Sequence, residues 1–205
     1  MSEKKTMLKE AAVLFAITLI AGLLLGGVHE LTKKPIEEQQ KKAVLEACSA
    51  VFPNKQNLNF EEISFTVPTD KEAMLSEQGV TIGTVFRASD AGSVCGYVIE
   101  SASSKGYGGT IDLYVGISNE GVVEGVSILE IKETPGLGME APNVLTPQFA
   151  GKKAQQFVFT KNGAAADKEV DAISSATITT RAVTNAVNGA VLVSSDLLEG
   201  GATHE

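Results

Sequence analysis

Residues 80–131 read VTIGTVFRASDAGSVCGYVIESASSKGYGGTIDLYVGISNEGVVEGVSILEI, and this stretch decides the fold. It holds a series of runs rich in β-branched and aromatic residues, at 80–89, 92–101, 110–118 and 122–131. Turn signals that contain Gly separate these runs, at residues 90–92, 105–109 and 119–121. Short β-rich runs joined by Gly-containing turns are typical of hairpins, so the stretch predicts an antiparallel meander.

Helices are predicted on both sides of this meander. A helix beginning after Pro35 and covering residues 36–52 has an apolar face, and a second begins at Thr177, with apolar residues recurring at helical spacing. Residues 54–78 are polar and predict a loop with one short strand at 63–67. After the meander we expect a Pro- and Gly-rich loop, a short helix at 143–149, a strand at 155–160 and a flexible segment at 161–170. The chain is therefore expected to be an α+β domain with helices packed on a sheet.

The N-terminal region carries an apolar segment. Residues 11–28 contain no charged side chain, and at about 1.5 Å per residue they suffice to cross most of a bilayer core. A cleaved secretory signal is the alternative, because lysines precede the run, but no Ala-x-Ala site follows it. We favour an uncleaved transmembrane helix. Lysines flank both ends of the segment, so the positive-inside rule does not orient it.

The soluble part is acidic. The chain has 17 basic and 25 acidic residues, of which residues 1–34 hold five basic and three acidic ones. The remaining residues therefore include 12 basic and 22 acidic side chains, a formal net charge of −10. This balance argues against nucleic acid or an anionic lipid surface as its partner. Cys48 and Cys95 form no metal-binding motif and predict two buried thiols, with a disulfide as the alternative.

Several common catalytic sites are absent from the sequence. There is no phosphate-binding G-x-x-x-x-G-K-[ST] loop, no dinucleotide-binding glycine motif and no H-E-x-x-H zinc motif. The two histidines, His29 and His204, lie in the apolar region and the C-terminal tail, so no histidine is placed to activate a nucleophile. Nothing in the sequence positions a carboxylate pair. We predict no catalytic residue and no metal site.

Residues 171–180, DAISSATITT, are unusually rich in hydroxyl side chains. They can serve simply as a helix N-cap. They can also hold a phosphate, because free N–H groups and hydroxyls would donate to it at the helix start, with Arg181 as a counter-charge. The glycines of residues 105–110, KGYGGT, permit either tight turns or close approach to a ligand.

Three stretches together resemble one known family: DAISSAT (171–177), KETPGLG (132–138) and GYGGTIDLYVGI (106–117). Their order and spacing resemble those of the G subunits of the Rnf complex, a membrane-bound ferredoxin:NAD oxidoreductase that couples electron transfer to ion movement. The C subunits of the sodium-pumping NADH:quinone oxidoreductase are similar. The resemblance covers residues 85–195 and extends loosely to the N-terminal helices. Family members often have Gly where this chain has Ser175.

The resemblance implies that FMN is attached through a phosphoester to Thr177, and that Asp171 belongs to the pattern recognised for this modification. An external flavin transferase using FAD is implied, because an aliphatic hydroxyl does not form the ester unaided. Ser174, Ser175 and Ala176 form the turn before Thr177. We expect the loop to contact the flavin ring through Glu133, Thr134, Gly136, Leu137 and Gly138.

The implied organisation is a single-pass subunit in the plasma (inner) membrane of a prokaryote. Its parts are a cytoplasmic N-terminus (1–10), a transmembrane helix (11–29), a linker helix and loop (35–84), an extracytoplasmic FMN-binding domain (85–195) and a flexible tail (196–205). Other membrane subunits and membrane lipid are the implied partners. The alternatives are a C-type subunit of a sodium-pumping NADH:quinone oxidoreductase and a membrane-anchored scaffold domain without a redox group.

Overall fold

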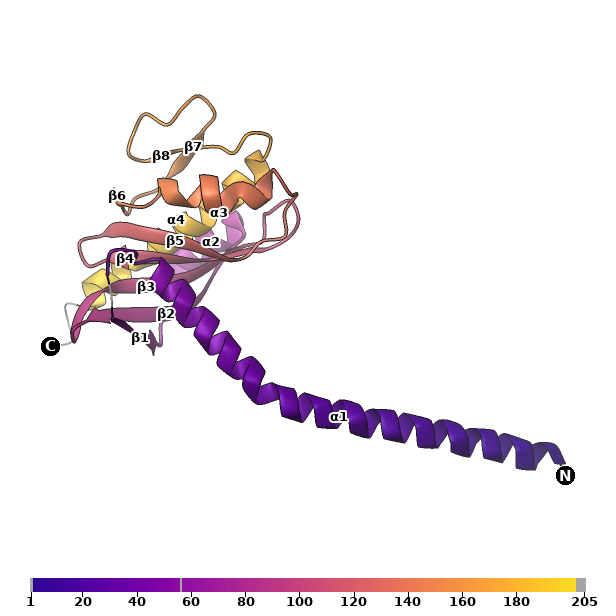
Figure 1. Cartoon of the computed structure of the whole chain (residues 1–205). Helices are drawn as coiled ribbons and strands as arrows, with labels where there is room; N and C mark the ends of the chain where they lie inside the picture. Colours follow the sequence, from indigo (N-terminus) through magenta and orange to yellow (C-terminus); the bar gives the residue numbers. More distant parts are fainter. Residues whose placement is uncertain (1, 56, 202–205) are drawn as a thin grey trace. The chain divides into compact units, whose positions relative to one another are not determined.

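The computed structural model describes residues 2–55 and 57–201 (Figure 1). The chain divides into two units, Met1–Val44 and Leu45–Glu205, and helix α1 (Ser2–Ala50) runs through the boundary. The helix predicted to begin after Pro35 is therefore a continuation of the first one, and Pro35 lies inside it. A single proline removes one hydrogen bond, and the helix-favouring residues on both sides keep the helix continuous.

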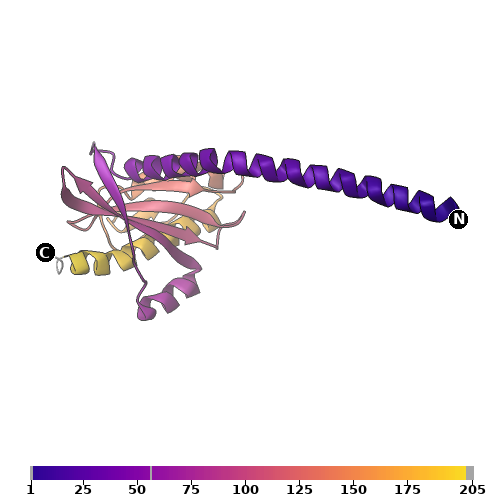
Figure 2. The same ribbon diagram turned by 90° about the horizontal axis from the view of Figure 1, so that it is seen from below.

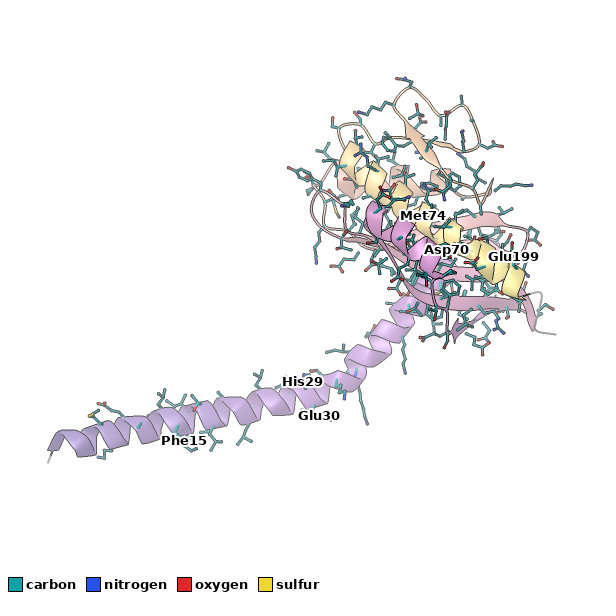
Figure 3. All side chains as sticks on the ribbon, turned by 180° about the vertical axis from the view of Figure 1, so that it is seen from behind. Phe15, His29, Glu30, Asp70, Met74 and Glu199 are labelled. Atoms are coloured by element: carbon teal, nitrogen blue, oxygen red, sulfur yellow. The ribbon has the colours of Figure 1, made fainter. Side chains whose placement is uncertain are left out.

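The first unit is helical, and residues 11–28 of it are apolar. Side chains between residues 13 and 28 are exposed, among them Phe15 and Leu25, which are 67% and 74% exposed. In Figure 3 Phe15 points outward from the helix axis. This helix is long and apolar enough to cross a membrane.

The second unit is built on a six-stranded antiparallel sheet in which neighbours in sequence are neighbours in space. The predicted meander is confirmed. In order the strands are β1 (Leu58–Ile63), β2 (Val80–Asp90), β3 (Ser93–Ser103), β4 (Ile111–Ser118), β5 (Val122–Glu130) and β6 (Lys152–Lys153).

Helix α4 (Thr177–Gly201) packs along one face of this sheet (Figure 2). Leu113, Val115 and Ile117 alternate along β4 and are fully buried in the same cluster as Val183 and Val187. Alternate residues of the strand and residues at helical spacing on α4 thus pack together in one core. The hydroxyl of Ser101 on β3 donates to the Ala186 carbonyl, 2.8 Å away.

Val51, just after α1, packs on the opposite face of the sheet. A Cβ atom added to Gly116 or Gly125 would lie 2.7 and 2.9 Å from the Val51 carbonyl oxygen. These two positions on neighbouring strands must therefore be glycine. Cys48 is buried beside this contact, as predicted, whereas Cys95 is only half-buried, and both are free thiols.

The loop predicted over residues 54–78 is wrong in most of its length, and the short strand predicted at 63–67 lies earlier, as β1. Besides β1, the segment contains helix α2 (Thr69–Gln78), which ends where Gly79 adopts φ +68°. Lys71 Nζ donates to the Leu192 carbonyl and to Asp196 Oδ1, both at 2.8 Å. These bonds hold α2 beside α4, and Figure 3 shows Asp70 and Met74 on the helix.

The segment between the sheet and α4 contains η1 (Gly138–Glu140), α3 (Ala141–Val144) and η2 (Thr146–Gln148). A parallel pair follows, β7 (Val158–Thr160) with β8 (Glu169–Asp171). The helix predicted at 143–149 and the strand at 155–160 thus appear in shortened form.

The segment predicted to be flexible ends in β8, and the loop before it is held by carboxylates. Ala164 N–H donates to Asp171 Oδ1 at 2.7 Å, and Ala165 N–H donates to Glu169 Oε2 at 2.9 Å. The tail expected over 196–205 begins as helix, because α4 extends to Gly201; the remainder lies outside the described residues.

Candidate functional site

The loop that follows β5 contains a tight turn. Leu137 N–H donates to the Thr134 carbonyl at 3.1 Å, and Gly136 adopts φ +73°. Pro at the second position and Gly at the third are the residues that a type II turn requires. The sequence therefore dictates this turn, which presents Leu137 and Gly138 toward α4.

Gly138 lets this loop approach α4 closely. A Cβ atom at this position would lie 2.6 Å from Thr179 Oγ1 and 2.7 Å from Glu133 Cβ. Any larger residue would push the loop away from the helix.

A second turn precedes α4. Ala176 N–H donates to the Ile173 carbonyl at 3.1 Å, and Ser175 adopts φ +61°. A positive φ at the third position of a turn favours Gly, so this chain has Ser at a position whose backbone conformation suits Gly. The turn places Thr177 as the first residue of α4.

Thr180 and Thr177 have different environments. Thr180 is fully buried, whereas Thr177 is half-buried. Thr180 Oγ1 accepts a hydrogen bond from Ile173 N–H at 3.1 Å and donates to the Ala176 carbonyl at 2.9 Å. The Thr180 hydroxyl is thus engaged in holding the turn, and Thr177 is the accessible threonine.

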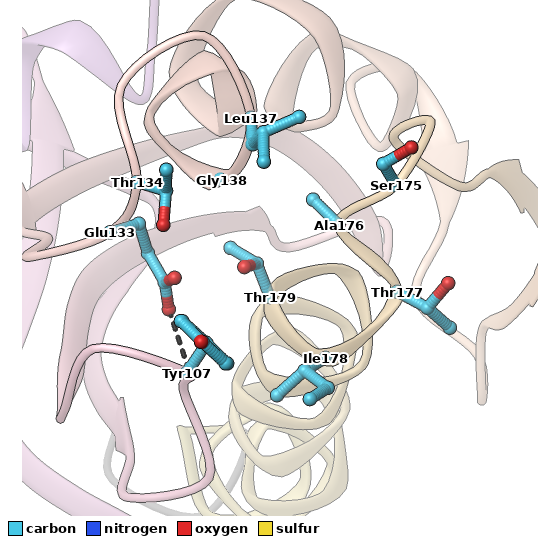
Figure 4. A pocket seen from close by; sticks show the side chains of 10 residues that line it. All are labelled: Tyr107, Glu133, Thr134, Leu137, Gly138, Ser175, Ala176, Thr177, Ile178 and Thr179. Atoms are coloured by element: carbon cyan, nitrogen blue, oxygen red, sulfur yellow. Dashed lines mark hydrogen bonds between the residues drawn. The ribbon is translucent and has the colours of Figure 1, made fainter.

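The two turns form the walls of one pocket of about 530 Å³. Figure 4 shows Tyr107 and Glu133 at one side of it and Ser175 and Thr177 at the other. The side chains and backbone that line it are those of Tyr107, Glu133, Thr134, Leu137, Gly138, Ser175, Ala176, Thr177, Ile178 and Thr179.

The N-terminus of α4 gives one end of the pocket an anion-binding character. The first N–H groups of a helix have no carbonyl within the helix to bond, and the positive end of the helix dipole lies there. Thr180 is the first residue whose N–H bonds back, to the Ala176 carbonyl at 2.9 Å. A phosphate near Thr177 would therefore meet free donors.

Glu133 supplies the only carboxylate among the described residues that line the pocket, and its charge is directed at backbone N–H groups. Oε1 accepts from Tyr107 N–H at 2.8 Å and from Gly108 N–H at 3.4 Å. The expected counter-charge, Arg181, does not line the pocket; its Cζ lies 5.9 Å from the centroid of the Phe159 ring. Arg181 follows Thr177 by one helical turn, and it is the contact of its side chain with Phe159, not the helix periodicity, that accompanies its absence from the lining.

Most of the residues predicted for the site come together. The pocket gathers Glu133, Thr134, Leu137 and Gly138 from one segment with Ser175, Ala176 and Thr177 from another. Gly136 and Ser174 do not line it. They act instead as the turn residues that set the direction of their neighbours.

Sequence reasoning missed Tyr107, Ile178 and Thr179. The glycines around Tyr107 drew attention to its loop, but nothing in the pattern selected the tyrosine itself. Asp171, predicted to take part in recognition, is exposed and lies outside the lining. Its N–H donates to Gln148 Oε1 at 2.6 Å.

Two family models match this chain. A model of the FMN-binding domain matches residues 106–192, and a model of the RnfG N-terminal region matches residues 1–51. The G subunit of the sodium-translocating ferredoxin:NAD oxidoreductase complex of Acetobacterium woodii is 32% identical over 94% of both chains.

Two further G subunits of ion-translocating oxidoreductase complexes are also similar. That of Aliivibrio fischeri is 34% identical over 91% of this chain and 89% of its own, and that of Methanosarcina acetivorans is 32% identical over 93% and 96%. The crystal structure of Shewanella oneidensis NqrC superposes with a TM-score of 0.49 and 25% identity, over 57% of this chain and 61% of that one. The chain belongs to the family of G subunits of the Rnf ion-translocating oxidoreductase complexes and contains their FMN-binding domain.

Proposed function

We propose that this chain is the membrane-anchored, FMN-carrying electron-transfer subunit of a ferredoxin:NAD oxidoreductase complex that translocates ions. One observation carries the proposal: the family's two motifs, far apart in sequence, form opposite walls of one pocket with Thr177 at its edge. A scaffold domain without a redox group would not need this pocket.

The pocket fits a flavin in size and in chemistry. Its volume of about 530 Å³ is within the range of roughly 300–1,000 Å³ typical of ligand sites. Leu137 and Ile178 supply apolar surface for a planar ring, and the start of α4 supplies donors for a phosphate. The ring and the phosphate therefore have separate complementary regions.

We propose Thr177 as the attachment point. An external flavin transferase would use FAD: the Thr177 oxygen bonds to the FMN phosphorus, the pyrophosphate bond breaks, AMP leaves and the hydroxyl proton is released. This reaction needs an accessible hydroxyl. Thr177 is half-buried at the pocket edge. The Thr180 hydroxyl is buried and both accepts and donates a hydrogen bond within the turn.

The chain holds and tunes the flavin and needs no acid or base of its own. A bound flavin supplies one- and two-electron transfer through its ring. Thr134 and Leu137 line the pocket from the turn that Pro135 and Gly136 fix, which supports a hydrogen bond from Thr134 to the ring and apolar cover by Leu137. The backbone of the type II turn holds these two residues in position, so their placement does not depend on a flexible side chain.

We propose that α1 anchors the subunit in the plasma (inner) membrane of a prokaryote as a single crossing, with the N-terminus in the cytoplasm and the flavin domain outside. Lipid and the other membrane subunits would surround its exposed apolar residues. A reporter that is active only in the cytoplasm, fused to the C-terminus, should be silent. Strong activity of this reporter would reverse the orientation.

The attachment is tested by co-expressing the chain with a flavin transferase and recording flavin fluorescence after denaturing electrophoresis. Only a covalent flavin survives this treatment. The wild-type chain and Thr180→Ala should give a fluorescent band, and Thr177→Ala should not. A labelled Thr177→Ala chain would refute the assignment, and an unlabelled wild-type chain would favour the scaffold alternative.

A further inference from the structure

The Glu133 carboxylate joins two loops that are distant in sequence. Glu133 follows β5, whereas Tyr107 and Gly108 lie between β3 and β4. Both of their N–H groups donate to Glu133 Oε1, at 2.8 and 3.4 Å. A carboxylate that accepts two backbone N–H groups fixes the conformation of the loop that carries them.

The loop lies directly on the backbone that follows β5. A Cβ atom at Gly108 would come within 1.6 Å of the Lys132 carbonyl oxygen. One at Gly106 would come within 2.2 Å of the Gly109 carbonyl oxygen and 3.0 Å of Glu133 Oε1. Glycine at both positions is therefore required for the carboxylate to reach the loop.

This contact leaves Tyr107 in an unusual position for a large aromatic residue. Tyr107 lines the pocket yet is 71% exposed. Within the described part of the chain, it is the only aromatic side chain of the lining. Figure 4 shows it beside Glu133, across the pocket from the start of α4.

We propose that Glu133 is a positioning residue that fixes Tyr107 as the aromatic contact of the flavin ring. This inference rests on the proposed function. The role assigned to Glu133 here is carried by Oε1, which both N–H groups of the Tyr107 loop share. The exposed face of Tyr107 gives a planar ring an apolar partner, and offset or edge-to-face aromatic contacts are favourable.

Flavin fluorescence lifetimes report this contact, since a tyrosine ring in contact with a flavin quenches its emission by electron transfer. The full-length, covalently flavinylated chain in detergent should show a short-lived, quenched population and a long-lived one. The ratio of their amplitudes measures the equilibrium between docked and undocked ring.

The expected results separate the aromatic ring from the carboxylate that positions it. Tyr107→Leu removes the one aromatic ring of the described lining, so it should abolish the quenched population and gives the reference for flavin without this contact. Glu133→Ala keeps the Tyr107 ring but frees its loop, so it should lower the ratio of quenched to unquenched flavin about 2- to 10-fold, as for the loss of one aromatic contact. Glu133→Gln should keep the wild-type ratio, because its amide oxygen accepts the same hydrogen bonds. Glu130→Ala, at the exposed ion pair with Lys132, is the control and should keep the wild-type ratio of quenched to unquenched flavin.

A second measurement needs no flavin. Amide hydrogen exchange of Tyr107 and Gly108 in the unmodified chain should be faster in Glu133→Ala and unchanged in Glu133→Gln. The inference is overturned if Tyr107→Leu leaves the lifetimes unchanged, if Glu133→Ala keeps the wild-type ratio, or if exchange at these amides is insensitive to Glu133. A wild-type chain without covalent flavin would instead refute the proposed function, and the exchange measurement would still test the loop contact.

Discussion

The Thr180 hydroxyl accepts the backbone N–H of Ile173, 3.1 Å away, and thereby closes the turn that presents Thr177. Thr180→Ala would leave this buried N–H without an acceptor. We expect the free energy of unfolding to fall by about 1–3 kcal/mol, measured by denaturant titration. Covalent flavin should be retained, because Thr177 is intact.

Thr184→Ala is the matched control. Thr184 is also a buried threonine of α4, but its hydroxyl donates to the Thr180 carbonyl at 2.8 Å, a group that the helix already bonds. Its loss should cost less than that of Thr180. Equal losses in the two variants would show that the bond to Ile173 is not the cause.

The sheet and α4 could be predicted because their signals are local. Alternation along 80–131 and helical spacing after Thr177 are properties of neighbouring residues. Helix α2 was missed because its sequence is polar and its main attachment is distant: Lys71 bonds to Leu192 and Asp196 on α4. The left-handed Gly79 was a C-cap signal that could have been recognised.

Ser175 occupies a glycine position. A φ of +61° costs an L-residue roughly 1–2 kcal/mol of conformational energy, which Gly would not incur. Gly also raises the conformational entropy of the unfolded chain, which offsets about 0.4–1 kcal/mol of this stabilisation. Ser175→Gly should therefore raise the free energy of unfolding by about 0.5–1 kcal/mol. Ser174→Gly is the control, since Ser174 is not among the positive-φ residues of the described chain, and it should destabilise. Stabilisation by both changes would contradict the turn argument.

The site was predicted from motifs, and what the motifs omitted depends on tertiary contacts. Thr179 lines the pocket because Gly138 allows the loop to approach it. Tyr107 lines it because Glu133 binds its N–H. Neither contact has a sequence pattern, since each joins residues that are far apart along the chain.

Leu137 is predicted to tune the flavin without being needed for its attachment. Leu137 and Met139 are equally exposed, at 37% and 38%, but only Leu137 lines the pocket. Leu137→Ala should keep the fluorescent band and shift the flavin midpoint potential by about 10–30 mV, as for loss of part of one apolar contact. Met139→Ala should leave the potential unchanged in the same spectroelectrochemical titration. Equal shifts would mean that the effect is not specific to the pocket.

Asp112 should make the domain less stable as pH rises. Partial burial, together with the charges of Glu100 and Glu130, raises the pKa of Asp112 above its usual 3.8, and Glu130 is its cross-strand partner. The folded state thus binds the proton more tightly than the unfolded state, so this contribution to stability is full below about pH 3.8 and is lost as pH rises through the higher folded pKa. At pH 7 the like charges oppose folding, and Asp112→Asn should raise the melting temperature there. The difference from wild type should shrink toward pH 3.8 and in high salt, because salt screens partly exposed charges.

Asp167→Asn, in the exposed loop before β8, is the matched control for Asp112→Asn. It removes the same charge and should leave the melting curve unchanged. A gain for Asp112→Asn that persists undiminished at low pH would show that its origin is packing and not charge.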